Sequence, residues 1–303
     1  MIRRMKNGDM VQPSNLEKDN YQIKEDGIFI SDSQRKRYQK IKEAKKYNEA
    51  VRQFSKEHGG FTLLRITDTY KQLDPATVGR LAFLSTYLNF GNTLLITDDN
   101  LPMMKRNLYD VLCISKPTAD SFYKECIANN LMADKQEDGL YLNDLYFHRG
   151  KVEDGSDKQA KLYCDTIRSL YRKMPAKSHK YFGYVIQLVP WINSEWNIVC
   201  RNPEEIDSDL ITPMNLTEIC ELLEIDTNHV ARFHKALTEP IFEFNGERQQ
   251  LCASIRTKAT QGMQQTIYIN PHLIYSGSDY RNVEGISVAF RPHKKAKAQK
   301  KAV

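Results

Sequence analysis

The segment Ile219-Cys-Glu-Leu-Leu-Glu-Ile-Asp226-Thr-Asn-His-Val-Ala-Arg-Phe233-His-Lys235 is the strongest indication of the architecture, because its pattern of residues occurs twice in the chain. The earlier copy is Leu108-Tyr-Asp-Val-Leu-Cys-Ile-Ser115-Lys-Pro-Thr-Ala-Asp-Ser-Phe122-Tyr-Lys124. A constant offset in residue number aligns Ser115 with Asp226 (226 − 115 = 111) and Phe122 with Phe233 (233 − 122 = 111). Ser and Asp are favoured helix N-caps, so each copy predicts a helix-turn-helix whose second helix they begin.

A closing stretch follows each copy. Leu140-Tyr-Leu-Asn143 precedes Gly150 by the same interval that separates Ile267-Tyr-Ile-Asn270 from Gly277 (150 − 143 = 277 − 270). The offset here is larger (270 − 143 = 127) than for the helix pair, by 16 (127 − 111 = 16). Each stretch is expected to close a β-hairpin. We place this insertion in a longer second hairpin, within 245–265, flanked by Ile241-Phe-Glu-Phe and Thr266-Ile-Tyr-Ile.

A duplicated supersecondary unit fixes the expected architecture. The predicted fold is mainly α with small antiparallel β-hairpins (α+β), as two tandem winged-helix domains preceded by a basic helix. The predicted parts are a mobile leader and basic amphipathic helix at 1–58, a first winged-helix domain at 59–152, a helical connector at 153–180, a second winged-helix domain at 181–285 and a basic tail at 286–303.

Three further elements follow from local patterns. The helix of the leader should run from Ser31 to about His58, since apolar residues recur there every three or four positions. Residues 101–112 are expected to form the first helix of the first helix-turn-helix. The segment 184–193 resembles 61–70 in placement, and both are expected to open a domain as strands.

The net charge of +6 is unevenly distributed. Residues 1–58 carry 14 Lys and Arg against 9 Asp and Glu, and residues 291–303 carry 6 Lys and Arg without an acid. The remaining residues, 59–290, carry 24 against 29. Basic ends on an acidic middle are typical of a nucleic-acid binder with electrostatic arms, although such a tail is also common as a merely solvated segment.

In a helix-turn-helix the second helix enters the major groove, while apolar side chains such as Phe122 and Phe233 hold the two helices together. Polar side chains on the opposite face contact bases and phosphates, and hairpin cations contact phosphates. The expected DNA-binding residues of the first copy are Lys116, Thr118, Ser121 and Lys124, with Lys135 in its hairpin. Those of the second copy are Thr227, Asn228, His229, Arg232 and Lys235, with Arg248, Arg256 and Lys258 in its hairpin.

The second copy is the better candidate for reading bases, because Asn pairs with adenine and Arg with guanine. Asn228 and Arg232 are expected to share one face of the helix. The alternative for Arg232 is a phosphate contact, or a surface ion pair with Glu224. In the first copy Asp120 would repel phosphate, which indicates a weaker reader or a dimerisation surface.

The motifs argue against catalysis. The sequence has no P-loop and no H-x-E, H-E-x-x-H or G-x-S-x-G pattern, so we expect no enzyme, no metal and no cofactor. A nuclease using a tyrosine would need a His-rich metal cluster, which the pattern of seven histidines does not provide. Six scattered cysteines and the lack of an apolar run of about 20 residues favour a cytoplasmic protein away from the membrane.

Both copies resemble the winged-helix core of RepL-type plasmid replication proteins. The closing stretch of that family, hydrophobic-Asn-Pro-x-Leu ending near Gly, is matched by Tyr268-Ile-Asn-Pro-His-Leu-Ile-Tyr-Ser-Gly277. Residues 141–150 match it with Asp144 in place of Pro, and Tyr184-Val-Ile-Gln-Leu-Val is similar to the opening segment. Members of that family carry one such unit, whereas this chain carries two. The tandem arrangement resembles that of other plasmid initiators, which are built from paired winged helices. The resemblance implies replication initiation.

The residues and the resemblance lead to one preferred function and two alternatives. The preferred function is a sequence-specific double-stranded DNA-binding protein of a plasmid or phage that initiates replication at origin repeats. It implies the host replication machinery as a partner. The first alternative is a transcriptional regulator at an operator, with RNA polymerase as the partner, and the second is an adaptor without DNA affinity. A homodimer and nucleoid association are compatible with both DNA-binding functions.

Overall fold

The computed structural model describes residues 3–4, 10–11, 21–23, 29–150, 158–259, 262–277 and 281–292. Contacts between residues divide the chain into two compact units, Met1–Lys56 and Glu57–Val303. Most of the predicted mobile leader, and residues 293–303 of the predicted tail, lie outside the described residues. The described parts of the leader form two strand pairs, β1 (Arg3–Arg4) with β2 (Met10–Val11) and β3 (Tyr21–Ile23) with β4 (Phe29–Ser31).

The helix predicted from Ser31 to about His58 is confirmed as α1 (Asp32–Glu57). Its start is fixed by a reciprocal cap between Ser31 and Gln34. The backbone N–H of Gln34 donates to Ser31 Oγ at 3.1 Å, and the N–H of Ser31 donates to Gln34 Oε1 at 3.2 Å. These bonds satisfy two amides that would otherwise lack helical partners.

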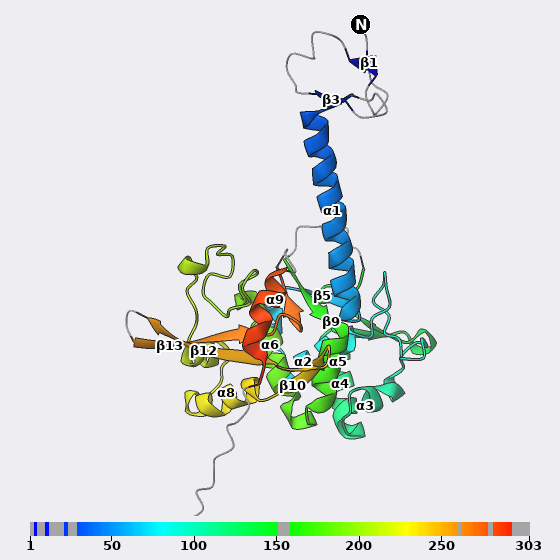
Figure 1. Ribbon diagram of the computed structural model, residues 1–303. Coiled ribbons are helices and arrows are strands. Elements are labelled where there is room, and N and C mark those ends of the chain that lie inside the picture. Colours follow the sequence, from blue (N-terminus) through cyan, green and yellow to red (C-terminus); the bar gives the residue numbers. More distant parts are fainter. Residues whose placement is uncertain are drawn as a thin grey trace, which may run out of the picture. The chain divides into compact units, whose positions relative to one another are not determined.

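The second unit is built around a four-stranded antiparallel sheet (Figure 1). Its strand order is β14 (Ile274–Tyr275), β9 (Gln159–Tyr163), β5 (Phe61–Arg65) and β8 (Phe147–His148). At the centre Leu63 lies opposite Lys161, its own counterpart in the other half of the chain (161 − 63 = 98). The β5–β8 pairing recurs as the β9–β14 pairing at the same positions. The sheet therefore has an approximate two-fold axis between β5 and β9.

Two helices cross beside this axis, α2 (Pro75–Ser85) and α6 (His179–Gln187). They cross at Gly79 and Gly183, which are counterparts at a constant offset (183 − 79 = 104). A Cβ atom on Gly183 would lie 1.6 Å from the carbonyl oxygen of Pro75, and one on Gly79 would lie 2.5 Å from that of His179. Because Pro75 and His179 are related by the same offset (179 − 75 = 104), the close approach is reciprocal, as a two-fold axis requires.

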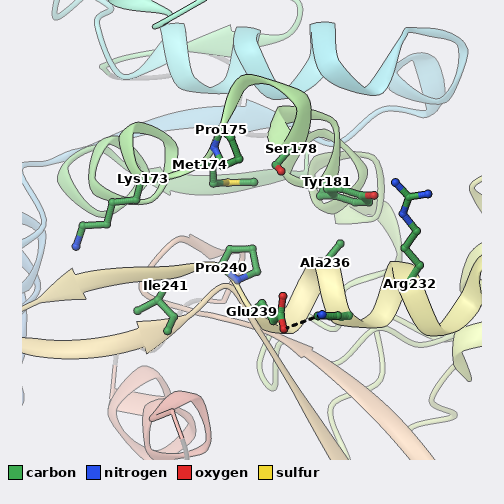
Figure 2. Close-up of a pocket in the computed structure, with 11 residues that line it drawn as sticks. Lys173, Met174, Pro175, Ser178, Tyr181, Arg232, Ala236, Glu239, Pro240 and Ile241 are labelled. Carbon is green, nitrogen blue, oxygen red and sulfur yellow. Dashed lines mark ion pairs between the residues drawn. The ribbon is translucent and has the colours of Figure 1, made fainter.

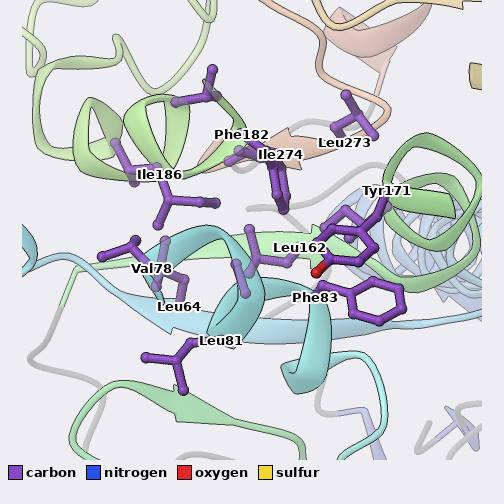
Figure 3. Packing of buried hydrophobic residues seen from close by; sticks show 14 of the residues in the cluster. Leu64, Val78, Leu81, Phe83, Leu162, Tyr171, Phe182, Ile186, Leu273 and Ile274 are labelled. Atoms are coloured by element: carbon purple, nitrogen blue, oxygen red, sulfur yellow. The ribbon is translucent and has the colours of Figure 1, made fainter. Parts of the chain in front are cut away.

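The main core lies between this helix pair and the sheet. Leu64 and Leu162, counterparts on the two central strands, are fully buried beneath Val78 and Ile186 of the two helices (Figure 3). Burying a side chain of this size contributes about 1.5–3 kcal/mol. Both halves of the chain thus share one hydrophobic core, and neither half is closed without the other.

The recurrence continues beyond the shared sheet. The isolated β-bridge between Leu94 and Tyr141 has a counterpart between Ile198 and Tyr268. The offset is 104 for the first residue (198 − 94 = 104) and 127 for the second (268 − 141 = 127). The hairpin of β6 (Met132–Asp134) and β7 (Leu140–Leu142) recurs as the wing, which consists of β12 (Cys252–Ala259) and β13 (Gly262–Ile269). In the wing the Cys252–Ile269 pair takes the place of the Met132–Leu142 pair. The predicted duplication therefore extends to strand register.

The position of the insertion differs from the prediction. The offset is 120 at the start of the wing (252 − 132 = 120) and 127 at its end (269 − 142 = 127). The larger part of the insertion (120 − 111 = 9) therefore precedes the wing, and the smaller part (127 − 120 = 7) lengthens it. The larger part accommodates a separate hairpin, β10 (Ile241–Phe244) with β11 (Glu247–Gln250), so the predicted pairing of 241–244 with 266–269 is wrong.

Asn245 and Gly246 turn this extra hairpin with φ angles of 48° and 76°, the left-handed conformation that a two-residue hairpin loop requires. The wing β12–β13 extends away from the helices (Figure 1). Both hairpins are antiparallel, and together with the helices they give the described chain an α+β arrangement.

Three other expectations need correction. Residues 184–193 do not open a domain as a strand, because α6 and a 3-10 turn occupy most of them. The opening strand is instead β9, which lies in the predicted connector together with α5 (Cys164–Lys173). Residues 101–112 are helical only over Lys105–Val111. The predicted tail begins inside a helix, α9 (Arg281–Ser287), and Phe290 beyond it is fully buried.

Short 3-10 helices connect these elements. They are η2 (Asp68–Gln72), η3 (Lys105–Asn107), η4 (Gln136–Asp138), η5 (Ala176–Ser178), η6 (Val189–Trp191), η7 (Ser208–Leu210), η8 (Thr227–His229) and η9 (Val288–Phe290).

Buried histidines make the stability of this fold depend on pH. His58 Nε2 and His272 Nδ1 lie 2.9 Å apart against the ring of Phe244, and burial, then the neighbouring His58, lowers the pKa of His272 to about 3. Burial, and then the charge of Arg80, lowers the pKa of His179 to about 4. Both values lie below the ordinary 6.5, so the unfolded chain takes up protons first as pH falls.

We therefore expect the contribution of these two histidines to the free energy of unfolding to be constant above pH 6.5 and to decrease below it, by about 1.4 kcal/mol per pH unit for each histidine. The decrease for His179 should end near its folded pKa of about 4, and that for His272 near about 3. Urea unfolding over this range measures it. His179→Phe, which keeps a ring against Tyr171, should show a shallower decrease. An equal decrease in both proteins would contradict the assignment of His179.

Candidate nucleic-acid interface

The first predicted helix pair is present as α3 (Leu108–Val111) and α4 (Lys116–Ala128). Ser115 caps α4, since its Oγ accepts from the N–H of Thr118 at 3.4 Å, and Cys113 turns the chain with a left-handed φ of 51°. Phe122 is buried beneath α4, as predicted. The opposite face of α4 is consequently exposed.

The four predicted contacts on α4 differ in their surroundings. Lys116 and Ser121 are exposed on α4, as is Lys124, whereas Thr118 shares its hydroxyl with the cap, 2.8 Å from that of Ser115. The hydroxyl of Ser121 donates to the carbonyl of Pro117 at 3.1 Å. Thr118 and Ser121 therefore already have hydrogen-bond partners next to or within α4, which leaves Lys116 and Lys124 as the clearer candidates for contact with DNA.

The negative charge of Asp120, which would repel phosphate on this face of α4, is neutralised. Asp120 forms an ion pair with Lys105 Nζ at 2.9 Å, and this contact lowers the pKa of the carboxyl group. Lys105, Arg106 and Tyr109 line an open groove of about 450 Å³ with the N-terminal half of α4. The sequence interpretation missed Lys105 and Arg106, although adjacent cations directly before a helix pair were a visible signal. The positive charges of Lys105 and Arg106 offset the negative charge of Asp120.

The second predicted helix pair is α7 (Leu216–Leu222) followed by η8 and α8 (Val230–Thr238). Its turn repeats that of the first pair, because Glu224 has a left-handed φ of 56° and is the counterpart of Cys113 (224 − 113 = 111). Asp226 accepts from the N–H of Asn228 at 2.9 Å. Phe233 is buried beneath α8, as predicted.

Thr227, Asn228 and His229 are exposed, but they lie in the 3-10 turn η8 and not in the first turn of an α-helix. The 3-10 turn winds more tightly, so the expected shared face of Asn228 and Arg232 is not the i, i+4 face of one continuous helix. These three residues still lead directly into α8 at its N-terminal end.

Arg232 and Lys235 are exposed on α8. Among the described residues Arg232 has no ion-pair partner, so the alternative pairing with Glu224 is absent there, whereas Lys235 lies 3.6 Å from Glu239. Both cations line an open groove of about 440 Å³ between α8 and the α5–α6 connection. Figure 2 shows Arg232 at one end of this groove and Lys173 at the other.

The predicted hairpin cations belong to three different hairpins. Lys135 is exposed in the β6–β7 hairpin, with its Nζ 4.1 Å from the centre of the Tyr141 ring. Arg248 is exposed on β11 of the extra hairpin, opposite Glu243, so its assignment to the second wing is wrong. Arg256 is exposed on β12 of the wing, and Lys258 belongs to the same strand, although its side chain lies outside the described part.

The wing is linked to α8 by a contact between Gln265 of β13 and His234 of α8, neither of which is among the predicted DNA-binding residues. Gln265 Nε2 lies 3.1 Å from His234 Nε2 and donates to Ser254 Oγ at 2.6 Å. Burial lowers the pKa of His234, and the positive charge of Arg256 lowers it further. Strand β12, which carries Arg256, contacts α8. The structure brings α8 and the base of the wing together on one side of the second copy.

No known protein family, curated protein or solved structure matches this chain. Within the described residues no three His, Cys, Asp or Glu side chains are grouped so that they could hold a metal ion. In the same part of the chain no helix is both long and apolar enough to cross a bilayer.

Proposed function

We propose that this chain is a non-enzymatic, sequence-specific double-stranded DNA-binding protein with two tandem winged-helix domains. The observation that carries the proposal is the repeated helix-turn-helix, capped at Ser115 and Asp226, with its apolar face buried and its polar face exposed. Each copy is followed by a hairpin that carries cations, as a winged helix needs. The basic side chains supply phosphate contacts.

The approximate two-fold axis gives the proposal a definite geometry. Two-fold dimers of helix-turn-helix proteins place their recognition helices in major grooves one helical turn apart. Here the axis lies within one chain, between β5 and β9. In the proposed arrangement it also relates α4 to α8, which carry counterpart residues of the duplication. A single chain would then contact two half-sites. Their sequences should differ, because Ser121 occupies the position of Arg232 (232 − 121 = 111).

The preferred role is initiation of replication at origin repeats of a plasmid or phage, in the cytoplasm and on nucleoid DNA, with the host replication machinery as partner. The alternative is transcriptional regulation at an operator. Selecting bound duplexes from random sequence and locating the preferred site distinguishes them. Repeated sites within an origin support the initiator, and a site overlapping a promoter supports the regulator. Failure to bind any duplex would leave the adaptor.

A further inference from the structure

The helix α1 carries the highest density of positive charge in the part of the chain that the structure describes. From Arg35 to Lys46 every residue is exposed. At a rise of 1.5 Å per residue this segment spans about 18 Å. It includes one acid, Glu43, and seven cations, a net charge of +6 (7 − 1 = 6). The cations are Arg35, Lys36, Arg37, Lys40, Lys42, Lys45 and Lys46.

Neighbouring acids neutralise little of this charge. Within the described residues one of the seven cations forms an ion pair, Arg35 with Asp32 at 2.8 Å. Lys36 and Lys40, and also Lys42 and Lys46, are like charges four residues apart, which destabilises an isolated helix. A polyanion would relieve this repulsion. A second copy of α1 would increase it, so α1 is not suited to pairing with itself.

The cations also surround the helix. Successive residues of an α-helix are turned by about 100°, so Arg35 and Lys42 point to one side while Arg37 and Lys40 point to nearly the opposite side. A helix with its side chains is about 10–12 Å wide and fits a DNA major groove about 12 Å wide, where phosphates flank it on both sides. Cations on both sides of α1 match that arrangement.

A membrane surface fits α1 less well. A helix that lies on a bilayer needs a broad apolar face opposite its charges. In the segment Arg35–Lys46 the exposed large apolar side chains are Tyr38 and Ile41, 67% and 47% exposed, and charged residues surround both. Phosphates in a groove require no such face. The charge pattern therefore favours nucleic acid over lipid.

We propose that Arg35–Lys46 of α1 is a second DNA site, which binds the sugar-phosphate backbone on both walls of a duplex groove without reading sequence. This site lies outside the repeated helix pairs. It extends the proposed function, and it rests on that function only in the choice of duplex DNA as the ligand. Its contribution is counterion release, which makes affinity fall as salt rises.

The test is the triple variant Lys36→Gln, Lys40→Gln and Lys42→Gln in the full chain. Glutamine has nearly the same helix propensity as lysine, and circular dichroism checks that α1 persists. The dissociation constant for a random duplex is measured at several salt concentrations. The slope of log affinity against log salt should become shallower by about 2–3, since each phosphate contact contributes about 0.9. The matched control replaces the exposed Lys71, Lys158 and Lys177 by Gln.

A change in slope no larger than that of the control would overturn the proposal. A second result would also overturn it: the wild type binds anionic phosphatidylserine vesicles, the triple variant does not, and the salt slopes of DNA binding are the same for both proteins. That result would assign α1 to a membrane. Replacing the same three lysines by arginine should preserve the slope, and a loss there would also count against the site. Sequence preference is a separate readout. Its absence would refute the proposed function while leaving the salt result of α1 intact.

Discussion

Replacing Gly183 by alanine is expected to lower the free energy of unfolding by about 3 kcal/mol or more. The added Cβ would lie 1.6 Å from the carbonyl oxygen of Pro75, and the nearest atoms belong to backbone, so no side-chain rotation can relieve the contact. Helices α2 and α6 would have to separate. Because the core is shared by both halves, this separation should loosen the whole second unit, and urea unfolding measures the loss.

Gly285→Ala is the matched control for this substitution. Gly285 is also helical, lies in α9 and is exposed, and an added Cβ would meet nothing within 4 Å. Alanine there should stabilise the protein by up to about 1 kcal/mol through helix propensity. If Gly183→Ala were as stable as this control, the close crossing of α2 and α6 would be wrong, and with it the two-fold arrangement.

Replacing Arg232 by alanine is expected to weaken binding to the preferred DNA site by about 1–3 kcal/mol. Arg232 is exposed on α8, has no ion-pair partner among the described residues, and follows the capped turn that aims this helix. Its guanidinium can bind one guanine through two hydrogen bonds. The measurement is the affinity of both proteins for a panel of duplexes with single base-pair changes.

The pattern over the panel separates two roles of Arg232. Loss of preference at one base pair means that Arg232 reads a base. A uniform loss over all duplexes means a phosphate contact, which is the pattern expected for the control Lys235→Ala. Lys235 shares the helix and the groove but lies near Glu239. No loss at all would show that α8 is not the recognition helix.

The helix pairs could be predicted from the sequence because their signals are local. Ser115 and Asp226 are helix caps, and Phe122 and Phe233 mark the buried faces at equal spacing. The polar site residues followed from that spacing. The contacts that these residues make with other segments of the chain could not be predicted from that spacing. Lys105, for example, lies in a different helical segment from the Asp120 that it neutralises, and no helical spacing links the two.

The missed elements depend on distant contacts or on ambiguous patterns. Strand β9 is short and pairs with β5, which lies in the other half of the duplication, so no local pattern identifies it. The apolar run within α6 is compatible with helix or strand until its length is known. Asn245-Gly246 was a readable signal for the extra hairpin, since this dipeptide favours two-residue turns.

We propose above that one chain presents two related recognition helices, α4 and α8, to one DNA duplex. Hydroxyl-radical footprinting of the full chain on its selected duplex tests it most directly. We expect two protected segments on the same face of the duplex, with centres roughly 10 base pairs apart, because a two-fold axis that relates α4 to α8 places them in successive major grooves. Protection of a single segment, or no protection by a chain that is folded, would contradict it.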